Sequence, residues 1–321
     1  MKYGEGNTIP KKRGVYPVYG SNGIVSFTER WNNENGIIVG HIGTVGNVVW
    51  AEGKHFVTYN GTIIKGISNI VLDKYLYYCL VLKKLEKLKK GGQPFLSISD
   101  IENTEIFIPS LKFQEKTSIF FSNFDNLISF HQRKYLKLEQ IKKSLLKKML
   151  PNDYKNTPSI RFRGFSESWK QRKLKEVIDI TKGEQLNKEK MFHYGLYPVI
   201  NGGTSPTGYF NKYNQEANTI TIAQGGAAGY VDFQQKRFWA SSHCYIIYLK
   251  NNEKISNKFL FYVLKNKEYI IRQKAYGATI MSVDKESILT LFLSLPIFNE
   301  QEKLGKFFFQ LDNLITLHQR E

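Results

Sequence analysis

Polar and basic side chains in this chain gather around predicted turns, where they could hydrogen-bond to nucleotide base edges or pair with phosphates. Any one of them alone is more often an ordinary turn residue, so the set stands as a hypothesis. The candidates are Asn22, Thr44, Asn47, Lys89, Lys90 and Gln93 in the first half, and Thr204, Ser205, Gln224, Tyr230, Arg272, Lys274 and Tyr276 in the second.

Motifs of the common catalytic sites are missing from the sequence. It contains no Asn-Pro-Pro-Tyr or Asp-Pro-Pro-Tyr methyltransferase motif, no Gly-x-x-x-x-Gly-Lys-Ser/Thr phosphate loop, no Gly-x-Ser-x-Gly elbow and no His-Glu-x-x-His. No cluster of Asp and Glu recurs in both halves, as a magnesium-dependent nuclease would require. We therefore predict no metal site and no catalytic residue in this chain, with catalysis supplied by another chain.

Two glycine-rich segments could be nucleotide loops or tight turns. Gly225–Gly229 resembles a nucleotide loop, but Gly43–Gly46 takes its place in the first half without the Lys-Ser that would bind phosphate. We predict that both are strand-to-strand turns, at which glycine lets the backbone approach a ligand closely.

Charge points to a polyanionic partner. The chain has 46 Lys and Arg against 28 Asp and Glu, a formal net charge of +18. Lys83–Lys90 carries five lysines against one glutamate, and Arg133–Lys148 carries seven basic residues against Glu139. Each run alone also fits a solvated helix face. Together with the net charge, they favour a surface that follows the phosphates of a nucleic acid or, less often, of an acidic membrane.

Cysteine content and hydropathy suggest where the protein works. Cys79 and Cys244 are the two cysteines of the sequence, and they form no disulfide or metal-binding pattern. The sequence shows neither a signal-peptide core nor an apolar run of membrane-spanning length. We expect a cytoplasmic protein with no membrane partner.

The chain is duplicated. Residues 124–133 return as residues 311–320, 187 positions later, with seven of ten identities, and Gln114-Glu115-Lys116 returns as Gln301-Glu302-Lys303 at the same spacing. This period is too long for a solenoid unit. Each copy should therefore be a domain plus a connecting element, with one ligand site per copy.

Periodicity predicts an α+β protein of two tandem mixed α/β domains separated by long antiparallel helices in a coiled-coil-like pair. Strands are expected at 36–40, 47–50, 219–223 and 243–249, and helices at 73–90, ending on Gly91-Gly92, and at 257–274. The expected divisions are 1–110 (first domain), 111–150 (long helix), 151–159 (linker), 160–297 (second domain) and 298–321 (second long helix).

The two long helices should pack through apolar stripes that include a pair of histidines. The stripe residues are Phe124, Leu127, His131, Leu138, Ile141 and Leu145 in the first helix, and Leu311, Leu314 and His318 in the second. Asn299 followed by Glu302 resembles a capping box for the second helix. Residues 134–150 extend past the point that matches Arg320, so we expect those turns to lack an antiparallel partner.

The second copy opens with Pro158-Ser159-Ile160-Arg161-Phe162-Arg163-Gly164-Phe165, followed by Trp169 and Leu174, and closes with the repeated Leu311–Arg320 segment. In these features the chain resembles the specificity subunit of type I restriction and modification systems. Relative to that family, residues 160–181 have no counterpart ahead of Met1 and the second helix is short. The resemblance therefore implies a clipped first recognition domain and a shortened C-terminal helix.

The resemblance also implies a function. Each domain would be a target recognition domain for one half of a split sequence in double-stranded DNA, and the helices would dock two modification subunits. S-adenosylmethionine would bind those subunits, and ATP and Mg²⁺ would serve the restriction subunits that join them, so this chain would bind no cofactor itself. Two other classes stay open from the residues: a stand-alone methyltransferase or nuclease, and a non-specific basic architectural DNA-binding protein.

Overall fold

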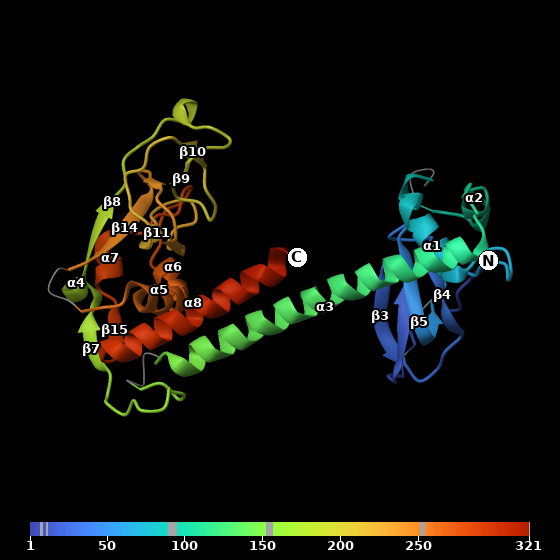
Figure 1. Cartoon of the computed structure of the whole chain (residues 1–321), viewed down its shortest axis with the longest axis horizontal. Coiled ribbons are helices and arrows are strands. Elements are labelled where there is room, and N and C mark those ends of the chain that lie inside the picture. The colour runs from blue at the N-terminus through green and yellow to red at the C-terminus, as the bar shows by residue number, and fades with distance from the viewer. Residues whose placement is uncertain (7–8, 11, 89–94, 152–156, 251–253, 321) are drawn as a thin grey trace. The chain divides into compact units, whose positions relative to one another are not determined.

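The computed structural model describes residues 1–320 except 7–8, 11, 89–94, 152–156 and 251–253. It divides into two compact units, Met1–Phe130 and His131–Glu321. The boundary falls inside the long helix α3 (Leu111–Met149), which the sequence analysis treated as a separate division (Figure 1). Each unit is described below by itself.

Unit 1 is built on a six-stranded sheet with the order β1-β6-β4-β5-β2-β3. Its strands are β1 (Lys2–Tyr3), β2 (Tyr16–Gly20), β3 (Gly23–Thr28), β4 (Asn33–Gly40), β5 (Val48–Val57) and β6 (Gly61–Ile64). Its helices are α1 (Asp73–Leu82), the short 3-10 helix η1 (Leu85–Leu88), α2 (Ile98–Glu102) and the first part of α3.

Alternation along these strands sends side chains to two separate cores. Ile37 and Val39 of β4 pack with the buried side chains of α1, such as Leu76 and Leu80. Ile38, between them, belongs to a second core on the other face of the sheet, with Tyr19 and Ala51. Strand β4 thus contributes side chains to the cores on both faces of the sheet.

The expected helix over 73–90 is interrupted. Helix α1 ends at Leu82, Lys84 has a positive φ of 50°, and η1 follows from Leu85. A non-glycine residue in the left-handed region breaks the hydrogen-bond ladder, and fully buried Leu85 anchors the chain after the break. The predicted cap at Gly91-Gly92 lies outside the described residues.

Unit 2 contains a four-stranded sheet of order β12-β11-β14-β8, a three-stranded sheet β10-β9-β13 and the pair β15-β7. Its strands are β7 (Lys170–Lys173), β8 (Ile178–Lys182), β9 (Tyr197–Ile200), β10 (Gly208–Phe210), β11 (Thr219–Ala223), β12 (Val231–Gln234), β13 (Trp239–Ala240), β14 (Cys244–Leu249) and β15 (Phe292–Leu295). Its helices are α4 (Leu174–Val177), η2 (Lys188–Lys190), α5 (Asn257–Asn266), α6 (Glu268–Gln273), α7 (Lys285–Leu289) and α8 (Phe298–Arg320), with the end of α3.

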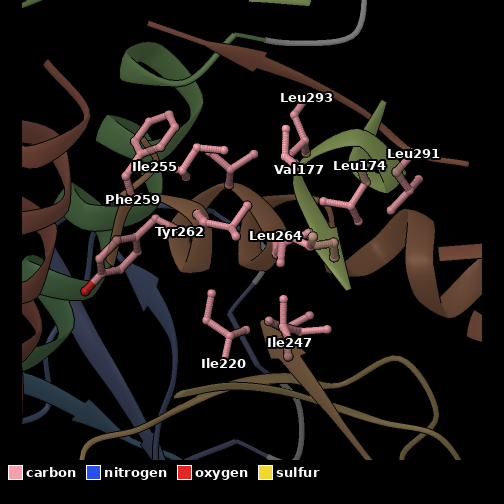
Figure 2. Close-up of a cluster of buried hydrophobic side chains, with 14 of the residues drawn as sticks. Leu174, Val177, Ile220, Ile247, Ile255, Phe259, Tyr262, Leu264, Leu291 and Leu293 are labelled. Carbon is pink, nitrogen blue, oxygen red and sulfur yellow. The ribbon is translucent and has the colours of Figure 1, made fainter. Parts of the chain in front are cut away.

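The largest core of unit 2 lies between the four-stranded sheet and its helices (Figure 2). Ile220 of β11 and Ile247 of β14 face Phe259, Tyr262 and Leu264 of α5, and all five are buried. The single helix expected over 257–274 is two helices, α5 and α6, separated at Lys267.

The two units share one strand plan. In unit 1, β4 pairs antiparallel with β5 and β6, and in unit 2, β11 pairs antiparallel with β12 and β14. An outer strand completes each arrangement, because β1 pairs with β6 as β8 pairs with β14. The duplication in the sequence is therefore a duplication of topology.

The repeated glutamine fastens each domain helix to its long helix in the same way. Buried Gln114 accepts a hydrogen bond from the Leu72 amide, at the N-terminus of α1, over 2.9 Å and donates one to Pro109 O over 2.8 Å. Buried Gln301 accepts from the Ser256 amide, at the N-terminus of α5, over 3.1 Å and donates to Pro296 O over 2.9 Å. Both glutamines thus satisfy backbone groups that a helix end would otherwise leave unpaired.

The repeated aspartate forms a second duplicated link. The Tyr78 hydroxyl of α1 donates to Asp125 Oδ2 over 2.7 Å, and the Tyr262 hydroxyl of α5 donates to Asp312 Oδ2 over 2.6 Å. Burial, together with the hydrogen bond to Asp125, raises the pKa of Tyr78 to about 12, so the phenol stays protonated and able to donate at neutral pH.

Within unit 2, α8 runs antiparallel to residues 131–149 of α3. Lys142 Nζ lies 2.5 Å from Asp312 Oδ1, and His131 Nδ1 lies 3.2 Å from His318 Nδ1. Near the start of α8, buried Leu304 and Phe308 share a core with Met149. The prediction that residues 134–150 would lack a partner was wrong, because an antiparallel pair matches the start of α8 with the end of α3.

Two further details of the long helices differ from expectation. The amides of Glu300 and Gln301 both donate to Ile297 O, at 3.0 and 3.1 Å, so the helix begins after Ile297 and Asn299 lies inside its first turn. The Asn299 capping box was therefore wrong. In the stripe, Leu145 packs on the core and Leu138 and Leu311 are half-buried, whereas Phe124, Leu127, Ile141 and Leu314 are exposed.

Candidate DNA interface

The same tight turn joins two neighbouring strands in each unit. Between β4 and β5, the Gly40 amide donates to Asn47 O and the Gly46 amide donates to Gly40 O, over 2.9 and 2.8 Å. Between β11 and β12, the Ala223 amide donates to Tyr230 O and the Gly229 amide to Ala223 O, over 2.9 and 2.8 Å. Both glycine-rich segments are thus strand-to-strand turns.

Glycine is required at the end of each turn. Gly46 and Gly229 have φ values of +80° and +84°, a conformation that L side chains rarely adopt. A Cβ on Gly46 would meet the backbone of Glu86 at 2.1 Å, and one on Gly229 would meet the backbone of Arg272 at 3.0 Å. Each turn therefore packs directly against the segment that follows its domain helix.

That close packing places basic side chains beside each turn. In unit 1, the exposed Lys83, Lys84 and Lys87 flank Leu85 and Glu86. In unit 2, Arg272 and Lys274 occupy the corresponding place at the end of α6. Basic and polar side chains are therefore neighbours at one end of the sheet in both units, the combination expected of a candidate DNA-binding surface.

The described unit 1 candidates lie together at this end of the sheet. Asn22 is exposed in the β2–β3 turn, and its neighbour Ser21 accepts hydrogen bonds from the Thr44 amide and from Asn47 Nδ2, each over 3.4 Å. Thr44 is exposed and its side chain can meet a ligand, whereas Asn47 is half-buried and helps to hold the turn. Lys89, Lys90 and Gln93 lie outside the described residues.

In unit 2, Thr204 and Ser205 are exposed on the loop after β9, and Gln224 opens the β11–β12 turn. The Gln224 amide donates to His243 O over 2.8 Å, and the Gln224 carbonyl accepts from the Val283 amide over 2.9 Å. These bonds use the backbone groups of Gln224 and not its side chain. Tyr276 is exposed, and its backbone pairs with Ser282. Lys274, at the end of α6, is half-buried.

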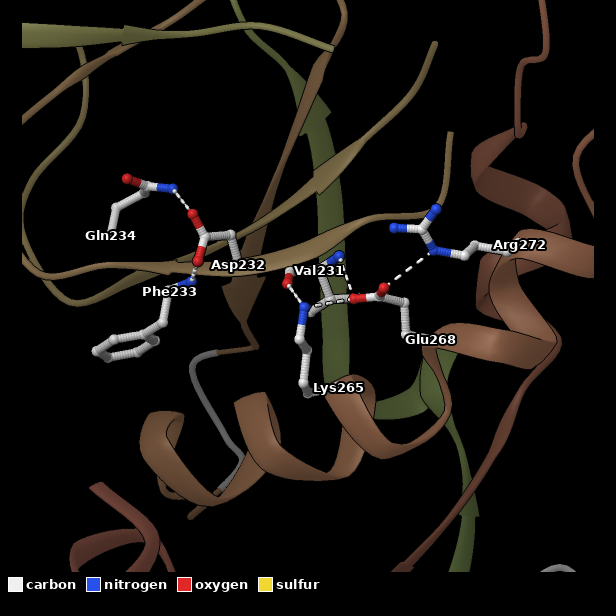
Figure 3. A network of polar contacts seen from close by, with 7 residues as sticks. All are labelled: Val231, Asp232, Phe233, Gln234, Lys265, Glu268 and Arg272. Carbon is white, nitrogen blue, oxygen red and sulfur yellow. Dashed lines mark hydrogen bonds and ion pairs between the residues drawn. The ribbon is translucent and has the colours of Figure 1, made fainter. Parts of the chain in front are cut away.

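Arg272 belongs to a polar network under the turn (Figure 3), and the Tyr230 ring lies against two of its members. Glu268 accepts hydrogen bonds from the Val231 amide, Lys265 Nζ and Arg272 Nε over 3.0, 2.6 and 2.9 Å. Burial alone would raise the pKa of Glu268, but these donors lower it below its ordinary value. Lys265 and Arg272 also lie over the Tyr230 ring, at 4.1 and 5.7 Å from its centroid. Arg272 is therefore held in place rather than free to reach in any direction.

His41 is a position that the sequence analysis missed. Its carbonyl accepts from the Leu96 amide over 3.1 Å, as the Gln224 carbonyl accepts from Val283, so His41 is the unit 1 counterpart of Gln224. The ring is buried among Tyr3, Tyr59 and Phe95. Aligning the two glycine-rich turns would have identified it.

Unit 1 should lose stability when its two buried histidines are forced to take up protons. Burial lowers the pKa of His41 and of His55 below the ordinary 6.5. In that case the unfolded state binds more protons once the pH drops below the unfolded pKa, and stability is lost as the pH falls toward the folded pKa. The free energy of unfolding should decrease by up to about 1.4 kcal/mol per pH unit for each histidine.

Native-state amide exchange of β4 and β5 at about pH 7.5 and about pH 5.5 measures this effect. His41→Gln, which installs the residue found at the same place in unit 2, should remove roughly half of the histidine contribution. An unchanged pH dependence in that variant would show that His41 does not resist protonation.

The described residues include no candidate metal centre. No group of three or more His, Cys, Asp or Glu side chains among them could hold a metal ion. Buried Cys244 has a pKa raised to about 12 by burial, so its thiol is not a ready nucleophile. Among the helices in the described part of the chain, none has the length and apolar content to span a membrane.

Comparison with known proteins agrees with this picture. The family model for the type I restriction modification DNA specificity domain matches residues 2–140 and 166–321. The specificity subunit of the type I restriction enzyme MjaVIII of Methanocaldococcus jannaschii is 26% identical over 90% of this chain and 75% of its own length. A Mycoplasma genitalium protein named as a type I specificity subunit is 30% identical over 50% of this chain, and the match spans 43% of its own length.

A solved structure supports the fold. The S subunit of a type I restriction-modification system from M. genitalium matches with a TM-score of 0.83 and 20% identity, covering 99% of this chain and 88% of that one. The two matched segments and the two equivalent turns leave the stand-alone enzyme and the architectural protein unfavoured. The chain belongs to the family of the type I restriction modification DNA specificity domain.

Proposed function

We propose that this chain reads a bipartite sequence in double-stranded DNA, with one half-site for each unit. The observation that supports the proposal is the duplicated turn, which brings basic and polar side chains together at one end of each sheet. Residues at the turn differ between the units, since Asn47 corresponds to Tyr230. Side chains that differ on a shared backbone suit two different half-sites.

We further propose that modification subunits dock on the long helices and that restriction subunits join them, all in the cytoplasm. The first half of α3 carries exposed apolar side chains along one stripe, with Phe124 50% and Leu127 52% exposed. An exposed apolar stripe of this kind is typical of a protein interface. In this proposal S-adenosylmethionine, ATP and Mg²⁺ bind the partner subunits, and this chain binds none of them.

Exchanging residues 1–110 for the matching segment of a relative should change one half of the methylated motif and leave the other half intact. Each unit has its own core and its own turn, so a replaced unit should carry its specificity with it. Mapping methylated adenines in a genome that expresses the hybrid with its modification subunit measures the outcome.

Two controls accompany the exchange. The native chain without the modification subunit should methylate nothing, and the native pair should give a motif with two separated halves. Changes in both halves of the hybrid's motif would contradict the assignment of one half-site to each unit.

A further inference from the structure

Three equivalent positions of the two sheets carry side chains of opposite polarity. In unit 1, Ile38 pairs with Val49, and Ala51 lies two residues farther along β5. In unit 2, the same ladder positions are Thr221, which pairs with Asp232, and Gln234, two residues along β12. These side chains lie on the sheet face opposite the main helical core, because their neighbours Ile220, Val231 and Phe233 belong to that core.

In unit 1 this face is a closed apolar core. Ile38, Ala51 and Tyr19 are buried together there, with Val49 packed against them. The same fold can therefore form with apolar side chains at these positions.

In unit 2 the corresponding space is a cavity of about 70 Å³, lined by polar as well as apolar side chains. The loop after β9 forms one wall, with Asn201, Thr204 and Ser205, and the ring of Tyr230 forms another. Asp232, Thr221 and Gln234 line the sheet side. The cavity is well below the 300 Å³ or so of a typical small-molecule site, so it suits a small group carried by a larger ligand.

Asp232 is fixed in the cavity by its own neighbours (Figure 3). Its Oδ1 accepts from the Phe233 amide and its Oδ2 from Gln234 Nε2, each over 2.9 Å, and Gln234 Nε2 also lies 3.2 Å from Thr221 Oγ1. Each carboxylate oxygen can accept about two hydrogen bonds, so the held carboxylate keeps acceptor capacity for a ligand.

The single negative charge of Asp232 limits the kind of ligand that the cavity can bind. Asp232 is the one carboxylate among the described residues that line this cavity, so a divalent cation would find a single charged ligand there rather than the several it needs. A phosphate would be repelled. A neutral N–H donor matches an immobile carboxylate, and the amino group of a paired base offers one, because its other hydrogen is used in the base pair.

The location of the cavity indicates that the amino group comes from bound DNA. Asp232 is the second residue of β12, directly after the turn that carries Tyr230, and Thr204 and Ser205 on the facing wall are exposed. The cavity therefore opens among the residues of the candidate DNA interface. Replacing an apolar core by partly buried polar groups costs free energy, which a role in recognition would offset.

We propose that this cavity of unit 2 receives the exocyclic amino group of a cytosine or adenine in the half-site read by that unit, with Asp232 as the acceptor that selects it. The proposal rests on the function proposed above. It makes Asp232 a specificity-determining residue with no counterpart in unit 1, where Val49 takes its place.

The test compares the native and variant proteins on parent and substituted DNA duplexes, in the manner of a double-mutant cycle. Duplexes that carry the mapped motif are made with purine in place of one adenine, or 2-pyrimidinone in place of one cytosine, at each position in turn. The native chain, with its modification subunit, should bind one such duplex roughly 5- to 150-fold more weakly than the parent duplex. The affected position should lie in the half-site of unit 2, and its identity tells adenine from cytosine.

The variant Asp232→Asn should bind the two duplexes with a clearly smaller difference in affinity than the native chain, because an uncharged amide oxygen is a weaker acceptor than a carboxylate. Asp179→Asn, on β8 at the other edge and other end of the same sheet, is the matched control and should keep the full difference. Melting temperatures of all three proteins show whether the variants are folded.

Two results would overturn the proposal. One is that no substituted position in that half-site weakens native binding, and the other is that Asp232→Asn keeps the native difference. Analogue binding by the native chain uses no variant, so the first result stands even if Asp232→Asn is unstable. A native complex that shows no preference for the motif over random DNA would instead refute the proposed function.

Discussion

Raising the salt concentration from about 50 to about 200 mM should weaken DNA binding roughly 10³- to 10⁵-fold. The net charge of +18 and the lysines beside the turns suggest contacts with on the order of six to ten phosphates. Each contact releases counterions, so log K should fall against log salt with a slope of about −5 to −9. Fluorescence anisotropy with a labelled duplex measures the slope, and a slope near −1 would remove the argument for backbone contacts.

The same experiment can test which lysines contact DNA phosphates. Lys83→Ala together with Lys87→Ala should make the slope shallower by about 1.8, because each lost contact removes about 0.9. Lys250→Ala is the matched control, since Lys250 follows β14 at the end of the sheet away from the turn and pairs with Asp179 over 3.7 Å. If the control and the double variant change the slope equally, the lysines beside the turn have no special part in binding.

Glu300→Ala should destabilise unit 2 by about 3–5 kcal/mol. The Glu300 carboxylate is 1% exposed and accepts from Arg161 Nε and Nη2 over 2.9 and 2.6 Å, a bidentate pair. Removing it leaves the Arg161 guanidinium largely buried, with a hydrogen bond from Nη1 to Glu167 O still in place. For a unit of this size the loss corresponds to a fall in melting temperature of roughly 6–20 °C.

The chain provides an exposed pair for comparison. Arg237 Nε lies 2.8 Å from Glu216 Oε2 with both side chains about half exposed or more, so Glu216→Ala should cost about 1 kcal/mol or less. Calorimetry on the two variants and the native chain gives both values. Equal and small losses would mean that Arg161 is solvated once its partner is gone.

Local pattern was enough to predict elements whose side chains alternate strictly or repeat over many turns. The strand Thr219–Ala223 and the start of the first long helix at Leu111 agree with the structure, because each is set by an unbroken apolar period. The helices at 73–90 and 257–274 were each interrupted, at Lys84 and Lys267, where tertiary anchoring by Leu85 and Ile271 overrides helix propensity.

By itself the sequence established the duplication, the glycine turns, the basic character and the resemblance to type I specificity subunits, because these depend on residue identity and spacing alone. Tertiary structure decided which repeated residues meet. Gln114 and Gln301 bond to helix ends more than forty residues away, which no local pattern reveals. It also decided the register of α8 on α3, since an antiparallel pair is aligned by contacts such as Lys142 with Asp312 and not by the order of the repeats. The cavity around Asp232 likewise appears only when strand pairing sets Thr221 beside it.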